Sequence, residues 1–385
     1  MQMDFHYYAT YCAAFLAGYS HEEAQDIAYS AQYVDCCTRT LLNRLRAPSS
    51  AVTTQLQLEM ANARTDLVGL QDITRIWASF HFLPGDLHAR VKAASPLYKS
   101  KYRLICNPNG PLAAETVELA RGGSLQAVGI AMHVIADTWA HRYFAGTPSL
   151  VINNTNNYFY ELLPDGSELP VVFSHIPGGA DDLEKRVFNG SIYSGSETSI
   201  MNLGHGRAGH LPDYSFMRYK YLPAWDNYEE IIKDNPTDYY KAFCQLIHAM
   251  KYLRGAVPEF RLNYYDTEAA APWEEEIWAI LRKRQLIACD DWKALGEKLS
   301  GREIEDFDVK RHEGEYLNLP RAEQNHSFLG RFFLAALAQK SMVTNRIFKS
   351  GNLIAGFSVD FAEKGFQGIQ DFKKLIEAVK EMRHD

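Results

Sequence analysis

Three polar residues interrupt an apolar stretch at residues 127–146, AVGIAMHVIADTWAHRYFAG. His133, Asp137 and His141 follow one another at intervals of four. An α-helix turns about 100° per residue, so these side chains lie along one stripe. The two histidines are about 12 Å apart along the axis, too far to share one ion, whereas Asp137 can reach towards both. The spacing suits a carboxylate that bridges two metals. The alternative is a core helix whose polar residues are paired by hydrogen bonds.

Further histidines and carboxylates that could join this stripe lie within the first 213 residues. The candidate ligands are Asp4, His6, Asp35, His81, His205, His210 and Asp213. The six cysteines form no C-x-x-C pair, so they resemble neither a zinc ribbon nor a disulfide framework. Imidazole and carboxylate ligands without cysteine suit zinc, manganese, iron or nickel. Together these residues predict a metal site, and separate buried hydrogen-bonded pairs are the alternative.

The elements that must position these residues are mostly helices. We expect helices at about 4–20, 21–45, 87–104, 112–121, 127–146, 226–254, 272–287, 290–299, 326–348 and 367–382. Residues 50–75 are mixed and polar and suggest a strand or an irregular crossing. Residues 150–198 are rich in Asn, Gly, Pro and β-branched residues, which predicts a small β-rich insertion. The predicted fold class is mainly α, with a metal-binding core at 1–215 and a C-terminal helical extension at 216–385 packed on it.

Composition excludes several classes of protein. The chain has 385 residues and is 46% hydrophobic, enough for a large core, and its net charge of -7 argues against general nucleic-acid binding. No run of 18 apolar residues occurs, so no membrane span is expected. The N-terminus lacks the basic segment of a signal peptide, and with the scattered cysteines this predicts a cytoplasmic protein. The oligomeric state stays open.

The order of the candidate ligands resembles the zinc-dependent phospholipase C and S1/P1 nuclease superfamily, all-helical enzymes with three clustered zinc ions. The matching segments are the N-terminal segment with His6, YSAQYVD ending at Asp35, ASFHF with His81, and HVIAD with His133 and Asp137. His141 follows, and then His205 or His210 with Asp213. The phrases HVIADTWAHRYFAG and DFHYYATY also resemble a family of uncharacterised bacterial proteins with no assigned activity.

This resemblance implies hydrolysis of a phosphodiester or phospholipid-type phosphoester by metal-activated water, with two or three ions, zinc before other metals. Asp137 would bridge the ions, and Asp35 or Asp213 would accept the proton of the water. The alternative is a non-catalytic binding protein on the same scaffold with a structural metal.

The sequence departs from the superfamily at three places. The superfamily ligates one ion through the free amine of an N-terminal Trp, whereas this chain begins with Met1 and offers Asp4 instead. His141 comes four residues after Asp137 rather than six. The closing pair is spaced by three or eight residues rather than four. The position built on Asp35, His81, His133 and Asp137 therefore matches best, and the position with Asp4 and His6 matches least.

Overall fold

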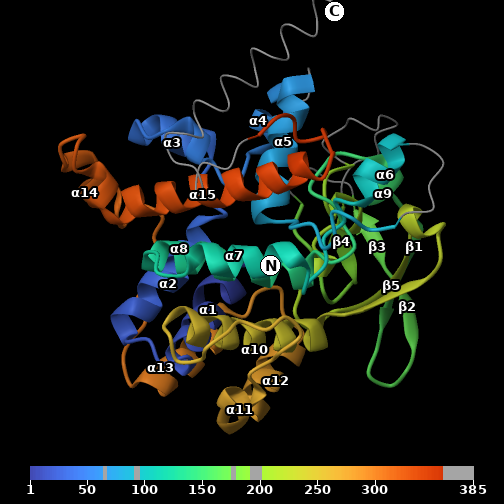
Figure 1. Cartoon of the computed structure of the whole chain (residues 1–385). Coiled ribbons are helices and arrows are strands. Elements are labelled where there is room, and N and C mark those ends of the chain that lie inside the picture. The colour runs from blue at the N-terminus through green and yellow to red at the C-terminus, as the bar shows by residue number, and fades with distance from the viewer. Residues whose placement is uncertain (64–66, 91–95, 175–178, 191–201, 359–385) are drawn as a thin grey trace, which may run out of the picture.

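The computed structural model describes residues 1–63, 67–90, 96–174, 179–190 and 202–358. The fold is mainly α with a small sheet region, as the sequence predicts (Figure 1). The expected helix at 367–382 lies outside the described residues. The largest hydrophobic cluster draws on residues from Met1 to Ala355. In the described part of the chain, none of the helices combines the length and apolarity needed to cross a membrane.

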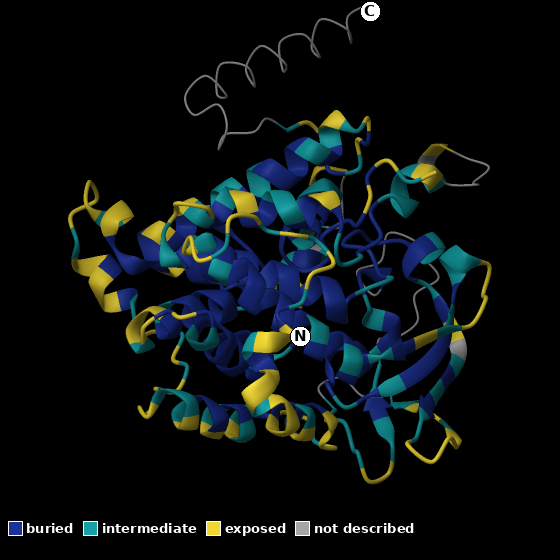
Figure 2. Cartoon of the chain, turned by 60° about the horizontal axis from the view of Figure 1, so that its bottom comes forward, coloured by how far each residue is buried: buried dark blue, intermediate teal, exposed yellow. Residues whose placement is uncertain are grey.

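Helix α8, Leu125–Ala140, is the central element. Ser124 caps its start by accepting a hydrogen bond from the Ala127 N–H. Four helices pack around it: α2 (His21–Tyr33), α7 (Pro111–Ala120), α10 (Asn235–Leu253) and α15 (Phe328–Lys349). Gly129 allows the close approach to α2, because a Cβ there would lie 2.4 Å from the Ile27 carbonyl oxygen. Figure 2 shows these central helices as largely buried.

The N-terminal segment begins with a π-helical turn, η1 (Asp4–Ala9), that continues into α1 (Thr10–Leu16). Such turns are rare and occur mostly at functional sites. The capping box of Ser20 and Glu23 opens α2 as predicted. The expected helix at 21–45 is interrupted, however, because α2 ends at Tyr33 and α3 (Arg39–Leu45) begins after Thr38, whose side chain caps it. Asp35 lies in the turn between the two helices.

Residues 57–63 and 67–75 are helical, so the expectation of a strand or irregular crossing over 50–75 was wrong for most of its described residues. After a short 3-10 turn η2 (Ser49–Ala51), helices α4 (Gln57–Ala63) and α5 (Leu67–Phe80) follow. The buried residues Ile73, Ile76 and Phe80 recur at helical spacing on α5. Helix α6 (Pro96–Tyr102) is shorter than the expected 87–104.

The predicted β-rich insertion is present, but its larger sheet also includes two strands that lie after residue 198. After α9 (Leu150–Asn153), one antiparallel sheet has the order β2-β1-β5-β6, formed by β1 (Thr155–Leu162), β2 (Glu168–Pro170), β5 (Arg218–Pro223) and β6 (Ile231–Asp234). Strands β3 (Val172–Ser174) and β4 (Val187–Asn189) form a parallel pair. The helix expected from 226 starts only at Asn235, because Asp234 caps it and Pro236 occupies its first turn.

The remaining elements cover the helical core and connect the sheet to it. The 3-10 turns η4 (Gly206–Ala208), η5 (Leu211–Asp213) and η6 (Ala224–Asp226) flank β5. The later segments are α11 (Thr267–Ala270), η7 (Ala271–Trp273), α12 (Glu274–Arg282), α13 (Cys289–Ser300), α14 (Glu313–Asn318) and η8 (Gln324–His326). Of these, α13 packs against η1, the turn that carries His6.

Candidate metal centre

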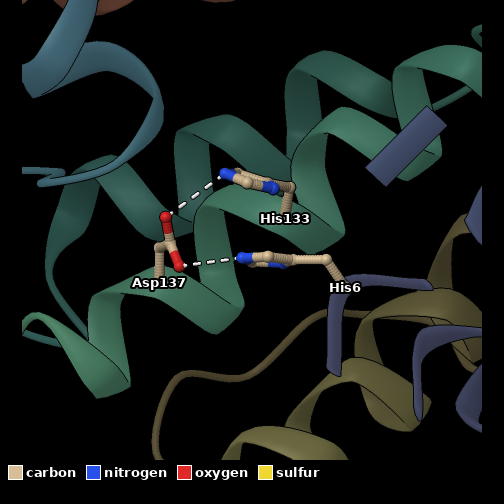
Figure 3. A group of neighbouring side chains, drawn as sticks. All are labelled: His6, His133 and Asp137. Carbon is tan, nitrogen blue, oxygen red and sulfur yellow. Dashed lines mark ion pairs between the residues drawn. The ribbon is translucent and has the colours of Figure 1, made fainter. Parts of the chain in front are cut away.

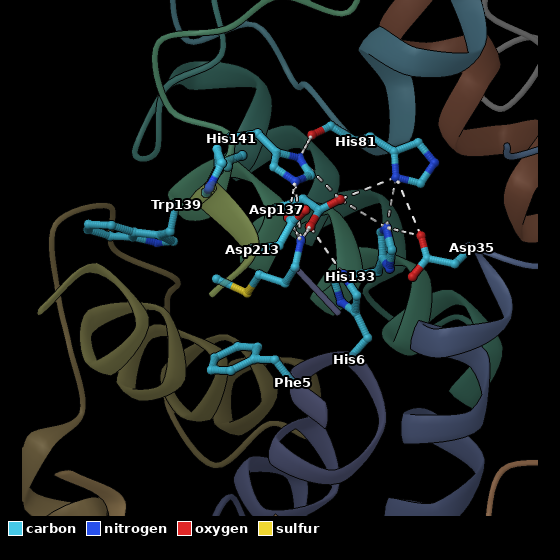
Figure 4. Close-up of polar contacts among 12 residues, drawn as sticks. Phe5, His6, Asp35, His81, His133, Asp137, Trp139, His141 and Asp213 are labelled. Carbon is cyan, nitrogen blue, oxygen red and sulfur yellow. Dashed lines mark hydrogen bonds and ion pairs between the residues drawn. The ribbon is translucent and has the colours of Figure 1, made fainter. Parts of the chain in front are cut away.

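Asp137 lies at the middle of a buried cluster and presents one oxygen to each side (Figures 3 and 4). Its Oδ1 lies 2.7 Å from the amino nitrogen of Met1 and 3.1 Å from Nε2 of His6. Its Oδ2 lies 3.2 Å from both Nδ1 of His81 and Nε2 of His133. The side chain of Asp137 is 1% exposed. Its Oδ2 also lies 3.5 Å from Nδ1 of His141, so Asp137 reaches both histidines of the α8 stripe, as their spacing predicts.

Three groups of side chains bring one potential ligand atom each within 4.8 Å of one another. The groups are His6 with His133 and Asp137, Asp35 with His81 and His133, and His141 with His205 and Asp213. They come from η1, the turn after α2, the segment after α5, helix α8 and the η4–η5 segment. These groups could hold metal ions, and they include most of the residues singled out in the sequence.

Backbone carbonyls orient two of the imidazoles towards the centre. Nδ1 of His133 lies 2.9 Å from the Ala31 carbonyl oxygen, and Nε2 of His81 lies 3.0 Å from the Thr53 carbonyl oxygen. Each carbonyl can only accept, so each of these ring nitrogens carries the proton. When both rings are neutral, the other nitrogens, Nε2 of His133 and Nδ1 of His81, present lone pairs that face each other at 3.3 Å. A cation bound by both nitrogens, or a proton added to one ring, makes this contact favourable.

The same arrangement recurs on the other side of Asp137. Nδ1 of His141 lies 2.7 Å from the His81 carbonyl oxygen, and Nδ1 of His205 lies 2.7 Å from the Gly209 carbonyl oxygen. Both rings therefore offer Nε2 to the centre. His6 is fully buried; its Nε2 contacts Asp137 Oδ1 without hydrogen-bond geometry, and its Nδ1 has no hydrogen-bond partner among the described residues. A neutral imidazole has one acceptor nitrogen, and a metal ion would satisfy it.

Protonation states favour ligation. Burial lowers the pKa of His6, His133 and His205 to about 4, so these imidazoles are neutral near pH 7. Neutral imidazole is the form that binds metals. The low pKa values follow from placing the rings in a protein interior where a positive charge is poorly solvated.

Charge in the centre is unbalanced. Burial disfavours charge on the Met1 amino group, but Asp137 and Asp213 outweigh it and raise its pKa to about 10. Burial also opposes ionisation of these two carboxyls, yet the surrounding histidines and the Met1 amine hold both pKa values well below the usual range. Asp35 adds a third carboxyl group. Burial raises the pKa of Asp35, so the two carboxylates held ionised are those of Asp137 and Asp213. They face one ammonium, and divalent cations would offset the remaining negative charge.

The contacts of Asp213 distinguish His205 from His210, the two histidines between which the sequence could not choose. Its Oδ1 lies 3.2 Å from Nε2 of His141, and its Oδ2 lies 3.6 Å from Nε2 of His205. His210 contacts the same Oδ2 through Nδ1 at 3.3 Å, but its side chain is 58% exposed, and it belongs to none of the three groups. The structure therefore brings His205 into the centre and leaves His210 at its rim.

The structure does not bring Asp4 to the centre. Its Oδ1 accepts a hydrogen bond from the Phe5 N–H and its Oδ2 from the Ala288 N–H, so it ties η1 to the start of α13. The amino nitrogen of Met1 lies where Asp4 was expected, 3.2 Å from Nε2 of His141 and 3.3 Å from Asp213. The reason is local: the π-helical turn points Asp4 away from α8 while it buries Met1 against the centre.

A cavity of about 300 Å³ opens onto the centre. Asp35, with a side chain that is 31% exposed, and His210 face it. Apolar side chains make up much of the remaining wall, namely Met60, Trp77, Phe82 and Leu203. A small molecule can therefore reach the ligand groups from solvent.

Comparison with protein families matches residues 1–347 to DUF6765, described as a family of unknown function. The chain belongs to this family. No curated protein and no solved structure matches it. The family assignment names no activity, so a function can be inferred only from the geometry of the centre.

Two kinds of participant escaped the sequence-based reasoning. The first is the Met1 amine, for which the only signal is that the chain runs from Met1 through an apolar, aromatic segment to His6. The second is the set of carbonyls that orient the rings, from residues such as Ala31 and Thr53. Backbone carbonyls occur at every position, so no residue type could reveal which of them contact the histidines.

Proposed function

We propose that this protein is a metal-dependent hydrolase that cleaves a phosphodiester or phospholipid-type phosphoester. The observation that carries the proposal is the pair of facing lone pairs on His81 and His133 beside the carboxylate of Asp137. Two neutral rings cannot form a hydrogen bond through these nitrogens, whereas a divalent cation would accept both lone pairs and the carboxylate oxygen together. Zinc fits best, because neutral imidazoles and carboxylates are its usual ligands where cysteine is absent.

Two or three ions would be held by the groups around Asp137. His6, His133 and Asp137 would hold one, Asp35 and His81 with His133 another, and His141, His205 and Asp213 a third, with the Met1 nitrogen beside the first and third. His133 belongs to two of the groups, which favours two fully occupied positions over three. Bound ions would hold a phosphoryl oxygen and lower the pKa of a bound water towards about 7.

Asp35 is the best candidate for the proton acceptor. Its Oδ1 lies 3.7 Å from Nδ1 of His81 and 3.9 Å from Nε2 of His133, longer than the contacts of Asp137. Asp213, the other candidate, has both oxygens in contact with histidines and is 9% exposed. Oδ2 of Asp35 accepts a single long hydrogen bond of 3.4 Å from Gln32. Asp35 is therefore the more loosely held carboxylate at the cavity, where it can accept a proton from a water molecule.

The order of ligands along the chain also supports this proposal. His6, Asp35, His81, His133, Asp137, His141, His205 and Asp213 occur in the order expected from the resemblance to the zinc-dependent phospholipase C and S1/P1 nuclease superfamily. The Met1 amino group would correspond to the N-terminal amine of this superfamily, and it would have to give up the proton that Asp137 and Asp213 stabilise before it could bind an ion. The cavity supports catalysis over the alternative of a structural metal, because structural metal sites are closed to solvent.

The test is metal content together with hydrolysis. The purified protein, expressed with added zinc, should contain at least one equivalent of metal by mass spectrometry and should hydrolyse a member of a panel of phosphodiesters and phospholipids. Asp35→Asn should keep the ion held by His6, His133 and Asp137 and lose hydrolysis. Metal below one equivalent would refute the proposal. Full metal occupancy without hydrolysis of any ester would favour the non-catalytic alternative.

A further inference from the structure

A second cavity, of about 650 Å³, lies where the sheet meets α12, and it shares no lining residue with the cavity of the metal centre. Four arginines line it: Arg186, Arg218, Arg282 and Arg284. The whole chain carries a net charge of -7, so this concentration of cationic side chains stands out against the rest of the molecule. We refer to it as the arginine pocket.

Carboxylates offset only part of this charge. Glu161, 3% exposed, receives two hydrogen bonds from the Arg284 guanidinium and lies 3.4 Å from Nε of Arg186. Asp234 lies 3.4 Å from Nε of Arg218. Arg282 has no carboxylate within ion-pair distance in the described part of the chain. Four cations therefore face two carboxylates, which leaves an excess of two positive charges.

Two guanidinium donors in the pocket are unused. Nε of Arg186 and Nε of Arg218 are buried, yet neither has a hydrogen-bond acceptor with suitable geometry among the described residues. A buried donor without an acceptor is costly, particularly on a charged group. An anion with several oxygens would supply the missing acceptors and the missing charge together.

Aromatic rings hold two of the arginines in place. The guanidinium carbon of Arg282 lies 4.3 Å from the ring centroid of Trp278, and that of Arg284 lies 5.1 Å from the centroid of Phe216. A guanidinium stacked on a ring keeps its planar fork in one orientation, so less rotational freedom is lost when a ligand binds. The pocket therefore has charge, free donors and preformed orientation.

We propose that the arginine pocket binds a phosphomonoester as a ligand site separate from the metal centre. A phosphomonoester carries up to two negative charges, which matches the excess, and its three terminal oxygens match the forked donors of arginine. The body of the ligand would contact the apolar part of the wall, formed by Leu162, Leu163 and Pro164. This proposal does not depend on the hydrolase activity.

Titration calorimetry with adenosine 5′-monophosphate tests the site on the full-length protein. Arg282→Gln is the informative variant, because Arg282 is exposed and unpaired and its loss should not unfold the chain. Lys283→Gln is the matched control. It removes one positive charge at the neighbouring residue, whose side chain pairs with Asp291 and does not line the pocket. Thermal unfolding of both variants checks that they fold.

We expect saturable binding by the wild-type protein, a Kd about tenfold higher for Arg282→Gln, and an unchanged Kd for Lys283→Gln. Inorganic phosphate should bind more weakly at the same site, and adenosine should not compete. Phosphate bound at the metal centre would be retained by both variants, so it cannot imitate this pattern. Absence of saturable binding, equal binding by all three proteins, or equal binding of adenosine would overturn the proposal.

Discussion

Helix α8 contributes to two buried polar clusters that differ in one respect. Asp137 belongs to the metal centre, and two residues later the Trp139 carbonyl belongs to a pair formed by Lys233 and Asp238. The ammonium of Lys233, 1% exposed, donates to the Trp139 carbonyl oxygen at 2.8 Å and to Asp238 at 2.7 Å. There, one cation meets one anion and a carbonyl acceptor. Around Asp137, acceptors outnumber donors and imidazole lone pairs face each other.

The difference shows which buried polar groups indicate function. Burial and charge are common to both clusters, so neither property by itself distinguishes them. The Lys233 cluster is complementary without any added group, as expected of an element that holds β6 against α8 and α10. The Asp137 cluster is complementary only if cations are added. The predictions below test that distinction, in order of decreasing expected effect.

The largest effect is expected for Asp137→Asn. The amide keeps the size of the carboxylate but removes the charge from the one residue that contacts both sides of the centre. Loss of a ligand shared by the ion positions should weaken metal binding by at least about a thousandfold, since even second-shell changes cost about tenfold to a hundredfold. Metal content after dialysis against a graded chelator series measures this. Retention of wild-type metal would show that Asp137 is not a ligand, and absence of metal from the wild-type protein would show that the centre is a hydrogen-bonded core.

Lys233→Met should destabilise the fold without affecting metal. The substitution leaves Asp238 and the Trp139 carbonyl without their cation, which should lower the free energy of unfolding by about 3 kcal/mol. Denaturant unfolding measures the change, and metal analysis of the folded protein should give the wild-type value. A parallel loss of metal would mean that the two clusters act as one unit.

A smaller effect on metal binding is expected at the two histidines beside Asp213, and it should differ between them. His205→Ala removes a member of a ligand group and should weaken metal binding by about tenfold or more, whereas His210→Ala at the exposed rim should change it by less than about threefold. Competitive chelator titration compares the two variants directly. An equal loss from both would place His210 among the ligands after all.

The smallest expected effect is a loss of stability at acidic pH. His6, His133 and His205 have folded-state pKa values lowered to about 4 from the ordinary value of 6.5, so the unfolded chain binds more protons between these two values. Their contribution to stability is therefore complete above pH 6.5 and falls as the pH is lowered towards 4. The melting temperature should drop by about 2 °C or more over this interval. Lys233→Met should show the same dependence, because it leaves the three histidines unchanged.

Much of the fold was readable from local patterns. The capping box at Ser20, the helix at 111–120 and the apolar C-terminal helix now described as α15 follow from caps and 3.6-residue periodicity. The errors fell where local signals compete. Helix α5 was missed because polar residues dilute its apolar stripe, and β6 was read as helix because four residues before a capped helix carry little pattern of their own.

The sequence by itself determined the stripe on α8 and the reach of Asp137 towards His133 and His141, because helical geometry places residues four apart on one face. It also provided the supply of imidazoles and carboxylates. Only the tertiary structure decided which of them meet: it brought in the Met1 nitrogen, turned Asp4 towards Ala288, and placed His205 rather than His210 beside His141. The reason is that these contacts join segments up to 284 residues apart, and the carbonyls that orient the rings leave no trace in residue type.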